Sequence, residues 1–211
     1  TTSYGKDLPG DRQLADLLAG LAQVPGLTRV RLSYLQPAET RPWLIQAIAE
    51  IPAVADYFDM SFQHSSPAVL RRMRRYGSTD SFLQLVEQIR DAAPDAGIRS
   101  NVIVGFPGET DDEFQASLEF VRQQGYAKVH VFKYSLREGT AAAAMAGQLP
   151  PEVKETRSRL MHRVGEQTAR QFQASLLGQV FDVLWETSPA RGPQGLPLWS
   201  GLTDNYVRVE L

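Results

Sequence analysis

The stretch IRSNVIVGFPGET, residues 98–110, decides the fold class of this chain. Its first seven residues are rich in β-branched and apolar side chains, which predicts a buried strand over residues 98–104. The two glycines that follow let the backbone turn sharply and approach a ligand closely. Thr110 and Glu113 then have the spacing of a capping box, which predicts the start of a helix. A strand that leads through a tight turn into a capped helix is the repeating unit of a parallel α/β sheet.

The same unit recurs along the first 140 residues. Apolar side chains with helical spacing predict helices near residues 14–21, 42–48, 67–74, 79–89 and 111–121. Further strands are predicted over residues 28–35, 57–62 and 127–134. Strands regularly separated by helices imply right-handed crossovers and a parallel sheet. Four strands are too few for a closed eight-stranded barrel, so we expect an open or partial TIM-like (βα) barrel.

The composition changes after residue 140. Alanine, glycine and proline predict a linker, and a long helix is expected from residue 152 to 177. Residues 179–186 and 205–211 alternate in the manner of strands, with a Pro/Gly-rich loop at 188–197 between them. The predicted organisation is a partial barrel over 1–147, a linker and connecting helix over 148–178, and a truncated small all-β domain over 179–211.

Composition and charge exclude several classes of protein. The chain has 211 residues, 43% of them hydrophobic and 22% charged, which is typical of a globular protein. A formal net charge of −2 argues against a chain-wide polycation, so any RNA-binding surface must be a local patch. With no cysteine, the chain cannot form a disulfide, offer a thiolate nucleophile or hold an iron–sulfur cluster by itself. No apolar run is long enough to span a membrane and no secretion signal is seen, so we expect a cytoplasmic protein without a membrane partner.

Polar residues follow the predicted strands at the ends where α/β sheets bind ligands. The loops concerned are residues 62–66, 105–110 and 132–140. Taken singly, each loop is also compatible with an ordinary strand-to-helix turn, and His64 with a surface or capping histidine. The run RRMRR at 71–75 is equally compatible with a solvated helix end and with a phosphate-binding patch.

Taken together, five motifs resemble those of the radical S-adenosylmethionine (SAM) methylthiotransferases. They are TSYG at 2–5, RVRLSYLQP at 29–37, FQHSS at 62–66 with the following Val69, Leu70, Met73 and Arg75, NVIVGFPGET at 101–110, and FKYSLREGT at 132–140. Residues 1–140 are similar to the later part of the family's partial barrel. Residues 173–211 are similar to the opening of its TRAM domain, a small OB-like β-barrel that binds RNA. The family's C-x-x-x-C-x-x-C loop, which holds the SAM-binding 4Fe–4S cluster, is expected shortly before Thr1.

The resemblance implies a cofactor site at the strand ends. In the intact enzyme SAM would be cleaved reductively to a 5′-deoxyadenosyl radical, which abstracts hydrogen from an unreactive carbon so that a methylthio group can be installed. The parent would carry two 4Fe–4S clusters, none held by this chain, with flavodoxin or ferredoxin as electron donor, and the fragment alone is expected to be inactive. The residues expected to bind the cofactor are Ser3, Tyr4, Gly5, Ser33, Gln63, Ser65, Asn101, Gly105, Phe106, Pro107, Gly108 and Phe132. Those expected to contact RNA are Arg71, Arg72, Arg74, Arg75 and Arg208, and no residue is assigned a catalytic or metal-binding role.

Two substrates are compatible with the resemblance. Residues 28–110 look like enzymes that methylthiolate an aspartate of ribosomal protein S12, whereas residues 128–211 look like tRNA enzymes of the threonylcarbamoyl-adenosine type. Divergence within one family and a chimeric chain both explain this difference. Because the TRAM module is the part expected to touch the macromolecular substrate, the expectation favours tRNA adenosine 37, with S12 as the alternative. A non-catalytic RNA-binding fragment is the remaining alternative, which a three-cysteine loop encoded upstream of Thr1 would exclude.

Overall fold

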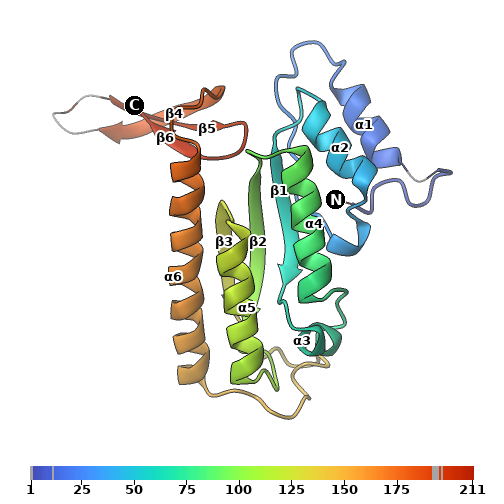
Figure 1. Ribbon diagram of the computed structural model, residues 1–211, viewed down its shortest axis with the longest axis vertical. Helices are drawn as coiled ribbons and strands as arrows, with labels where there is room; N and C mark the ends of the chain where they lie inside the picture. The colour runs from blue at the N-terminus through green and yellow to red at the C-terminus, as the bar shows by residue number, and fades with distance from the viewer. Residues whose placement is uncertain (1, 11, 192–194, 196) are drawn as a thin grey trace.

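The computed structural model describes residues 2–10, 12–191, 195 and 197–211. A three-stranded parallel sheet with its helices is followed by a long helix and a three-stranded antiparallel sheet (Figure 1). In chain order the elements are α1 (Gln13–Leu21), η1 (Pro37–Glu39), α2 (Pro42–Glu50), β1 (Tyr57–Gln63), α3 (Pro67–Arg72), α4 (Thr79–Ala92), β2 (Gly97–Val104), α5 (Asp111–Gln124), β3 (Lys128–Lys133), α6 (Pro151–Ser175), β4 (Val183–Arg191), β5 (Pro197–Thr203) and β6 (Arg208–Glu210). Within these described ranges, no helix combines the length and the apolar character needed to cross a membrane.

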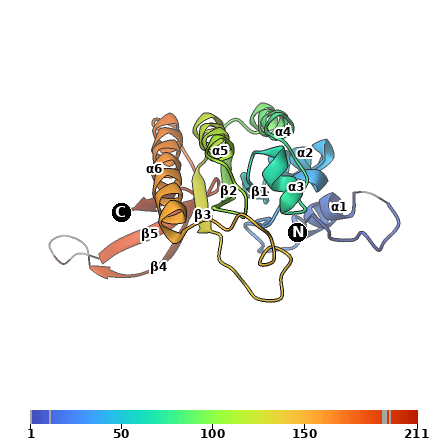
Figure 2. The same ribbon diagram turned by 90° about the horizontal axis from the view of Figure 1, so that it is seen from below.

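The parallel sheet has the strand order β1-β2-β3, and its long helices lie together on one face. Figure 2 shows α4, α5 and α6 side by side over the sheet, with the opposite face free of helices. Gly97 at the start of β2 lies opposite Tyr57, and Val104 at its end lies opposite Lys133. From Ile98 onward, buried and half-buried residues alternate along β2. One face of this strand therefore packs against the helices, and the other forms part of an open face.

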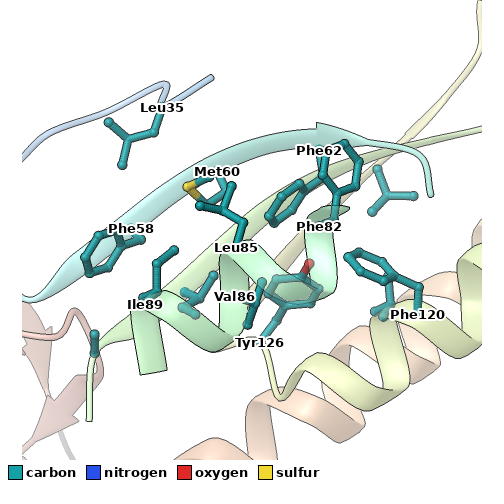
Figure 3. Close-up of a cluster of buried hydrophobic side chains, with 14 of the residues drawn as sticks. Leu35, Phe58, Met60, Phe62, Phe82, Leu85, Val86, Ile89, Phe120 and Tyr126 are labelled. Carbon is teal, nitrogen blue, oxygen red and sulfur yellow. The ribbon is translucent and has the colours of Figure 1, made fainter. Parts of the chain in front are cut away.

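The part of the hydrophobic core drawn in Figure 3 lies between β1 and the helices α4 and α5. The ring of Phe62 lies 4.5 Å from that of Phe82 and 5.9 Å from that of Phe120, measured between centroids. Tyr126, which is fully buried, has its ring 6.3 Å from those of both Phe62 and Phe120. Burial of side chains of this size contributes about 1.5–3 kcal/mol each. This aromatic cluster fixes the helices on one side of the sheet and so leaves the other side for a site.

Residues 28–35 do not form the predicted strand. Among the described residues, this segment makes only two isolated parallel β-bridges, Val30 to Val54 and Leu35 to Met60. Tyr34 has a φ of 60°, a left-handed conformation that interrupts an extended strand. The parallel sheet therefore has three strands instead of the four expected, whereas the predicted α/β class is confirmed.

The small β domain contains a strand that sequence reasoning missed. Pro197–Thr203 forms β5, and β4 continues to Arg191 through part of the stretch expected to be a loop; residues 192–194 and 196 of that loop lie outside the described residues. The strand expected over 205–211 is shortened to Arg208–Glu210. Tyr206, with a φ of 66°, occupies a turn in which the Thr203 N–H donates to the Val207 carbonyl at 3.0 Å. Pairing of β5 with both β4 and β6 supplies hydrogen bonds that the local sequence pattern does not indicate.

The small β domain contacts the amino ends of β1 and β2, at the opposite end of the sheet from the glycine-rich loop (Figure 1). Asn205 is 1% exposed, and its amide nitrogen donates to the Asp95 carbonyl at 2.8 Å. The rings of Tyr206 and Tyr57 lie 4.6 Å apart. At Gly97 a Cβ atom would lie 2.2 Å from the Asn205 carbonyl oxygen, so only glycine fits there. The turn around Asn205 thus attaches this domain to the parallel sheet.

Candidate functional site

The carboxyl ends of the three parallel strands lead into loops that are bonded to one another. The Tyr134 N–H, just after β3, donates to the Val104 carbonyl at the end of β2 at 2.9 Å. The Gly108 N–H donates at 2.8 Å to the carbonyl of Gly147, in the segment that precedes α6. Arg72 of α3 donates to the Gly108 carbonyl at 3.1 Å. These contacts bring the loops after all three strands into one region, as the parallel topology predicts.

The loop after β2 is shaped by the side chain of Glu109, which is fully buried. Its Oε2 atom accepts hydrogen bonds from the N–H groups of Gly105 and Phe106, the latter at 3.0 Å. Gly105 and Gly108 have φ values of 75° and 73°, which favour glycine. The predicted capping box of α5 is confirmed: Thr110 accepts from the Glu113 N–H at 3.2 Å, and Glu113 accepts from the Thr110 N–H at 2.8 Å. The loop is therefore a rigid structure with its own internal acceptor.

A guanidinium group from α6 compensates the buried charge of Glu109. Arg157 Nη1 donates to the Glu109 carbonyl at 3.1 Å and lies 3.1 Å from Glu109 Oε1 without the alignment of a hydrogen bond to it. Its Nη2 atom donates to Asp111 Oδ1 at 2.6 Å. Sequence reasoning missed Arg157 because it lies in a helix that reads as a connector, far along the chain from the motif.

His64 is buried beside this pair and is not the surface histidine that its sequence context allowed. Its Nδ1 atom accepts a hydrogen bond from the Ser66 N–H at 3.0 Å, so the proton of the neutral ring lies on Nε2. That Nε2 atom is 4.0 Å from Glu109 Oε1, too far for a hydrogen bond. Ser66 caps α3 by accepting from the Val69 N–H at 3.3 Å.

Buried polar atoms without a hydrogen-bonding partner gather at this end of the sheet. Among the described residues they are His64 Nε2, Ser65 Oγ, Arg72 Nε, Glu109 Oε1 and Tyr134 OH, with two others, Ser117 Oγ and Tyr126 OH, elsewhere. Buried polar groups in native proteins are nearly always paired, so unpaired ones point to a ligand, a water or a functional role. Their concentration at the strand ends supports a binding site there.

The open face of the sheet carries a polar cluster that the motifs did not single out. Arg99 on β2 forms an ion pair with Asp59 on β1, and its Nη2 atom donates to Asn101 Oδ1 at 3.0 Å. His130 on β3 lies opposite Asn101 in the strand register. Burial, together with the nearby Arg99 and Lys128, lowers the pKa of His130, which keeps the imidazole neutral at pH 7. Alternate polar positions in each strand were the signal that could have found this cluster.

The predicted cofactor-binding residues fall into two groups. Those on or after the strands share the sheet: Asn101, Gln63 and Phe132 lie on neighbouring strands, and Ser65, Gly105, Phe106, Pro107 and Gly108 follow them. The N-terminal ones lie beside η1, where Ser3 donates to Glu39 at 3.2 Å, next to a groove of about 610 Å³ that includes Tyr4 and Gly5. Ser33 accepts hydrogen bonds from the Arg31 guanidinium at 3.1 and 3.3 Å.

The predicted RNA-binding arginines differ in their surroundings. Arg72 is bound to Glu113 at 2.8 Å and to the Gly108 carbonyl, so it braces the loop and is not a free cation. Arg71, Arg74 and Arg75 are exposed, and no side-chain ion pair or hydrogen bond to another described residue restrains them. Arg208 is exposed but pairs with Glu186 at 2.8 Å.

A parallel sheet with helices on one face and polar, glycine-containing loops at its carboxyl ends is the architecture of (βα) barrels, and comparison with known proteins gives the class a name. The model of the radical SAM superfamily matches residues 9–121, and the chain belongs to this superfamily. The chain is 53% identical over 186 residues to the ribosomal protein uS12 methylthiotransferase RimO of Saccharopolyspora erythraea, and 52% identical over 187 residues to that of Kineococcus radiotolerans. These alignments cover 88% and 89% of the chain, but the chain spans only 38% of each relative. A solved structure, the radical SAM enzyme coproporphyrinogen III oxidase of Escherichia coli, shares the fold with a TM-score of 0.55 and 16% identity, over 81% of this chain and 37% of that one.

The residues present fit one part of the family's cofactor set and not the other. Glycines with positive φ and unpaired buried polar atoms at the strand ends fit a polar organic ligand such as SAM. A 4Fe–4S cluster has no ligands here, because the chain contains no cysteine. In the described part of the chain, no group of three or more His, Asp or Glu side chains is placed to hold a metal ion.

Proposed function

We propose that this chain is the later part of the barrel of a radical SAM methylthiotransferase that modifies ribosomal protein uS12. The observation that carries the proposal is the identity of about half of the residues, over most of this chain, to proteins named uS12 methylthiotransferases. The sequence motifs are divided between the two substrates, and the role expected of the TRAM module favours tRNA adenosine 37. The relatives support the alternative, uS12, and we adopt it for that reason.

The proposed division of labour follows the predicted domains. Residues 1–147 would form the barrel part with the cofactor loops, residues 148–178 the connecting segment and helix, and residues 179–211 the opening of a TRAM-like domain. The small β domain contacts the amino ends of β1 and β2 through Asn205 and Tyr206. A macromolecule bound by this domain would therefore extend along the molecule from that end. Exposed Arg71, Arg74 and Arg75 are the proposed RNA contacts on the barrel.

Binding of SAM is proposed at the carboxyl ends of the strands. The backbone from Gly105 to Gly108 would approach the adenosine, with Ser65, Gln63, Asn101 and Phe132 around it, and Ser3, Tyr4, Gly5 and Ser33 toward the methionyl end. The cofactor supplies the methyl group and the radical chemistry, and its cluster would be held by residues that precede Thr1, reduced by a flavodoxin or ferredoxin.

The chain's own residues would bind and orient the cofactor without being consumed. Glu109 keeps the Gly105 and Phe106 N–H groups satisfied internally, so the loop presents a fixed backbone surface and needs no reorganisation on binding. The ion pair of Arg99 with Asp59 fixes the amide of Asn101. The neutral ring of His130 beside it offers one hydrogen-bond donor and one acceptor to a substrate on the open face.

Two experiments test the proposal. First, the coding sequence upstream of Thr1 is read; a C-x-x-x-C-x-x-C loop is expected, and a start codon directly before Thr1 would contradict the proposal. Second, the full-length protein with its reconstituted clusters, SAM and a reductant is incubated with uS12 in one reaction and with tRNA in another. Mass spectrometry is expected to find a methylthio group on an aspartate of uS12 and none on tRNA. Modification of tRNA alone would contradict the proposal and favour tRNA adenosine 37 as the substrate.

A further inference from the structure

We propose that Arg157 of α6 is a positioning residue that holds the loop at 105–110 in its ligand-binding shape. The long helix is then a working part of the site and not only a connector. It lies outside residues 9–121, which the superfamily model matches, and none of the motifs includes it. The effect of Arg157 on the loop stands independently, whereas its effect on cofactor binding rests on the proposed function.

The first argument is the geometry of the guanidinium group. The Arg157 side chain is 6% exposed and reaches both sides of the loop's end at once. Nη1 donates to the Glu109 carbonyl at 3.1 Å, and Nη2 donates to Asp111 Oδ1 at 2.6 Å. Arginine can do this because its donors are fixed in a planar fork, whereas a lysine ammonium would have to choose one side.

The second argument is the charge of Glu109. Its side chain is fully buried. Among the described residues, Arg157 is the only cation that forms an ion pair with it, apart from a histidine 4.0 Å away. A buried carboxylate that loses its counter-ion either takes up a proton or moves toward water. In both cases its Oε2 atom becomes a poorer acceptor for the N–H groups of Gly105 and Phe106. Loss of Arg157 should therefore loosen a backbone segment that Arg157 itself does not touch.

A purely structural role makes a different prediction. The Arg157 guanidinium also lies over the ring of Phe114, 5.3 Å from its centroid, so truncation would disturb the packing of α6 on α5. That effect would destabilise the whole sheet. Arg157→Met is shorter than arginine but keeps the apolar stem of the side chain, and it removes the guanidinium group with its charge and its fork. Local loosening confined to the loop is the signature of positioning.

Amide hydrogen exchange, followed residue by residue by NMR on the protein, separates the two roles. In Arg157→Met we expect the Gly105 and Phe106 amides to exchange about tenfold faster, with β2 and β3 unchanged. Arg157→Lys should lie between Arg157→Met and the wild type. Arg159→Met, an exposed arginine on the same helix, is the matched control and should leave all these rates unchanged. Unchanged loop rates in Arg157→Met, or faster exchange across the whole sheet, would overturn the proposal. If Arg157→Met fails to fold, the same comparison is made with Arg157→Lys.

A titration with 5′-methylthioadenosine then tests the link to the cofactor. This probe carries the adenosine and a thioether but no group that needs the cluster. We expect a dissociation constant about five- to tenfold weaker in Arg157→Met than in the wild type and in Arg159→Met. Equal affinity despite a loosened loop would overturn the link between Arg157 and the cofactor. No binding by the wild type would count against the proposed function, while the exchange rates would still decide the role of Arg157 in the loop.

Discussion

Replacing Glu109 by alanine should destabilise the protein more than any exposed acidic substitution. The change removes the shared acceptor of the Gly105 and Phe106 N–H groups, each costing about 1–3 kcal/mol if left unsatisfied. The change also removes one of the two carboxylates that pair with Arg157, but the pair with Asp111 at 2.6 Å remains. The loss of this one ion pair therefore costs less than the about 3–5 kcal/mol that breaking a buried ion pair completely would cost. Water can reach the loop at the exposed Gly108, which favours the lower ends of these ranges. The sum is about 3–4 kcal/mol.

Urea unfolding followed by far-UV circular dichroism measures this cost. With an m value of about 2–3 kcal/mol per molar, the midpoint should fall by about 1–2 M. Glu109→Gln keeps one side-chain oxygen as acceptor and should lie between Glu109→Ala and the wild type. Glu87→Ala, at an exposed position of α4, is the matched control and should change stability by less than about 0.5 kcal/mol. A Glu109→Ala midpoint within experimental error of the wild type would refute the idea that this carboxylate holds the loop.

Three further predictions concern the surroundings of the site. In Gly97→Ala the new Cβ would lie 2.2 Å from the Asn205 carbonyl oxygen and would push the small β domain away from the parallel sheet. In limited proteolysis this domain should therefore be cleaved faster than in the wild type, while the parallel sheet stays resistant. Cleavage at the wild-type rate would contradict the contact between the two. Arg72→Ala should lower the free energy of unfolding by about 1–2 kcal/mol in thermal unfolding, because it loses the bonds to the Gly108 carbonyl and to Glu113. Arg71→Ala should leave the stability unchanged. Equal effects of the two variants would contradict a role of Arg72 in holding the loop. Burial raises the pKa of Glu113, but its bonds to a backbone N–H and to Arg72 outweigh this and lower it below 4.5. The stability advantage of wild type over Glu113→Gln should therefore be full above about pH 4.5 and vanish as the pH falls through the lowered pKa, and a difference independent of pH would contradict this.

Features that depend on neighbours a few residues apart were predictable from the sequence. The strands β2 and β3 begin and end within a residue of their predicted bounds, because their β-branched runs stop at turn residues. The cap Thr110 acts as expected, since a cap and the N–H group that it binds lie three residues apart. The glycine-rich loop also follows from a short stretch of sequence, and the superfamily follows from five such motifs taken together.

What only the tertiary structure decided depends on residues far apart in the chain. Arg157 meets Glu109 across 48 residues, and Asn205 meets Asp95 across 110, so no local pattern could pair them. The strand β5 exists because β4 and β6 offer it hydrogen bonds on both sides, although the local sequence pattern does not indicate a strand there. Residues 28–35 alternate like a strand, yet the left-handed backbone of Tyr34 breaks the pairing. Periodicity and caps act within one turn or one strand, whereas a buried ion pair or a sheet partner is chosen by the packing of the whole chain.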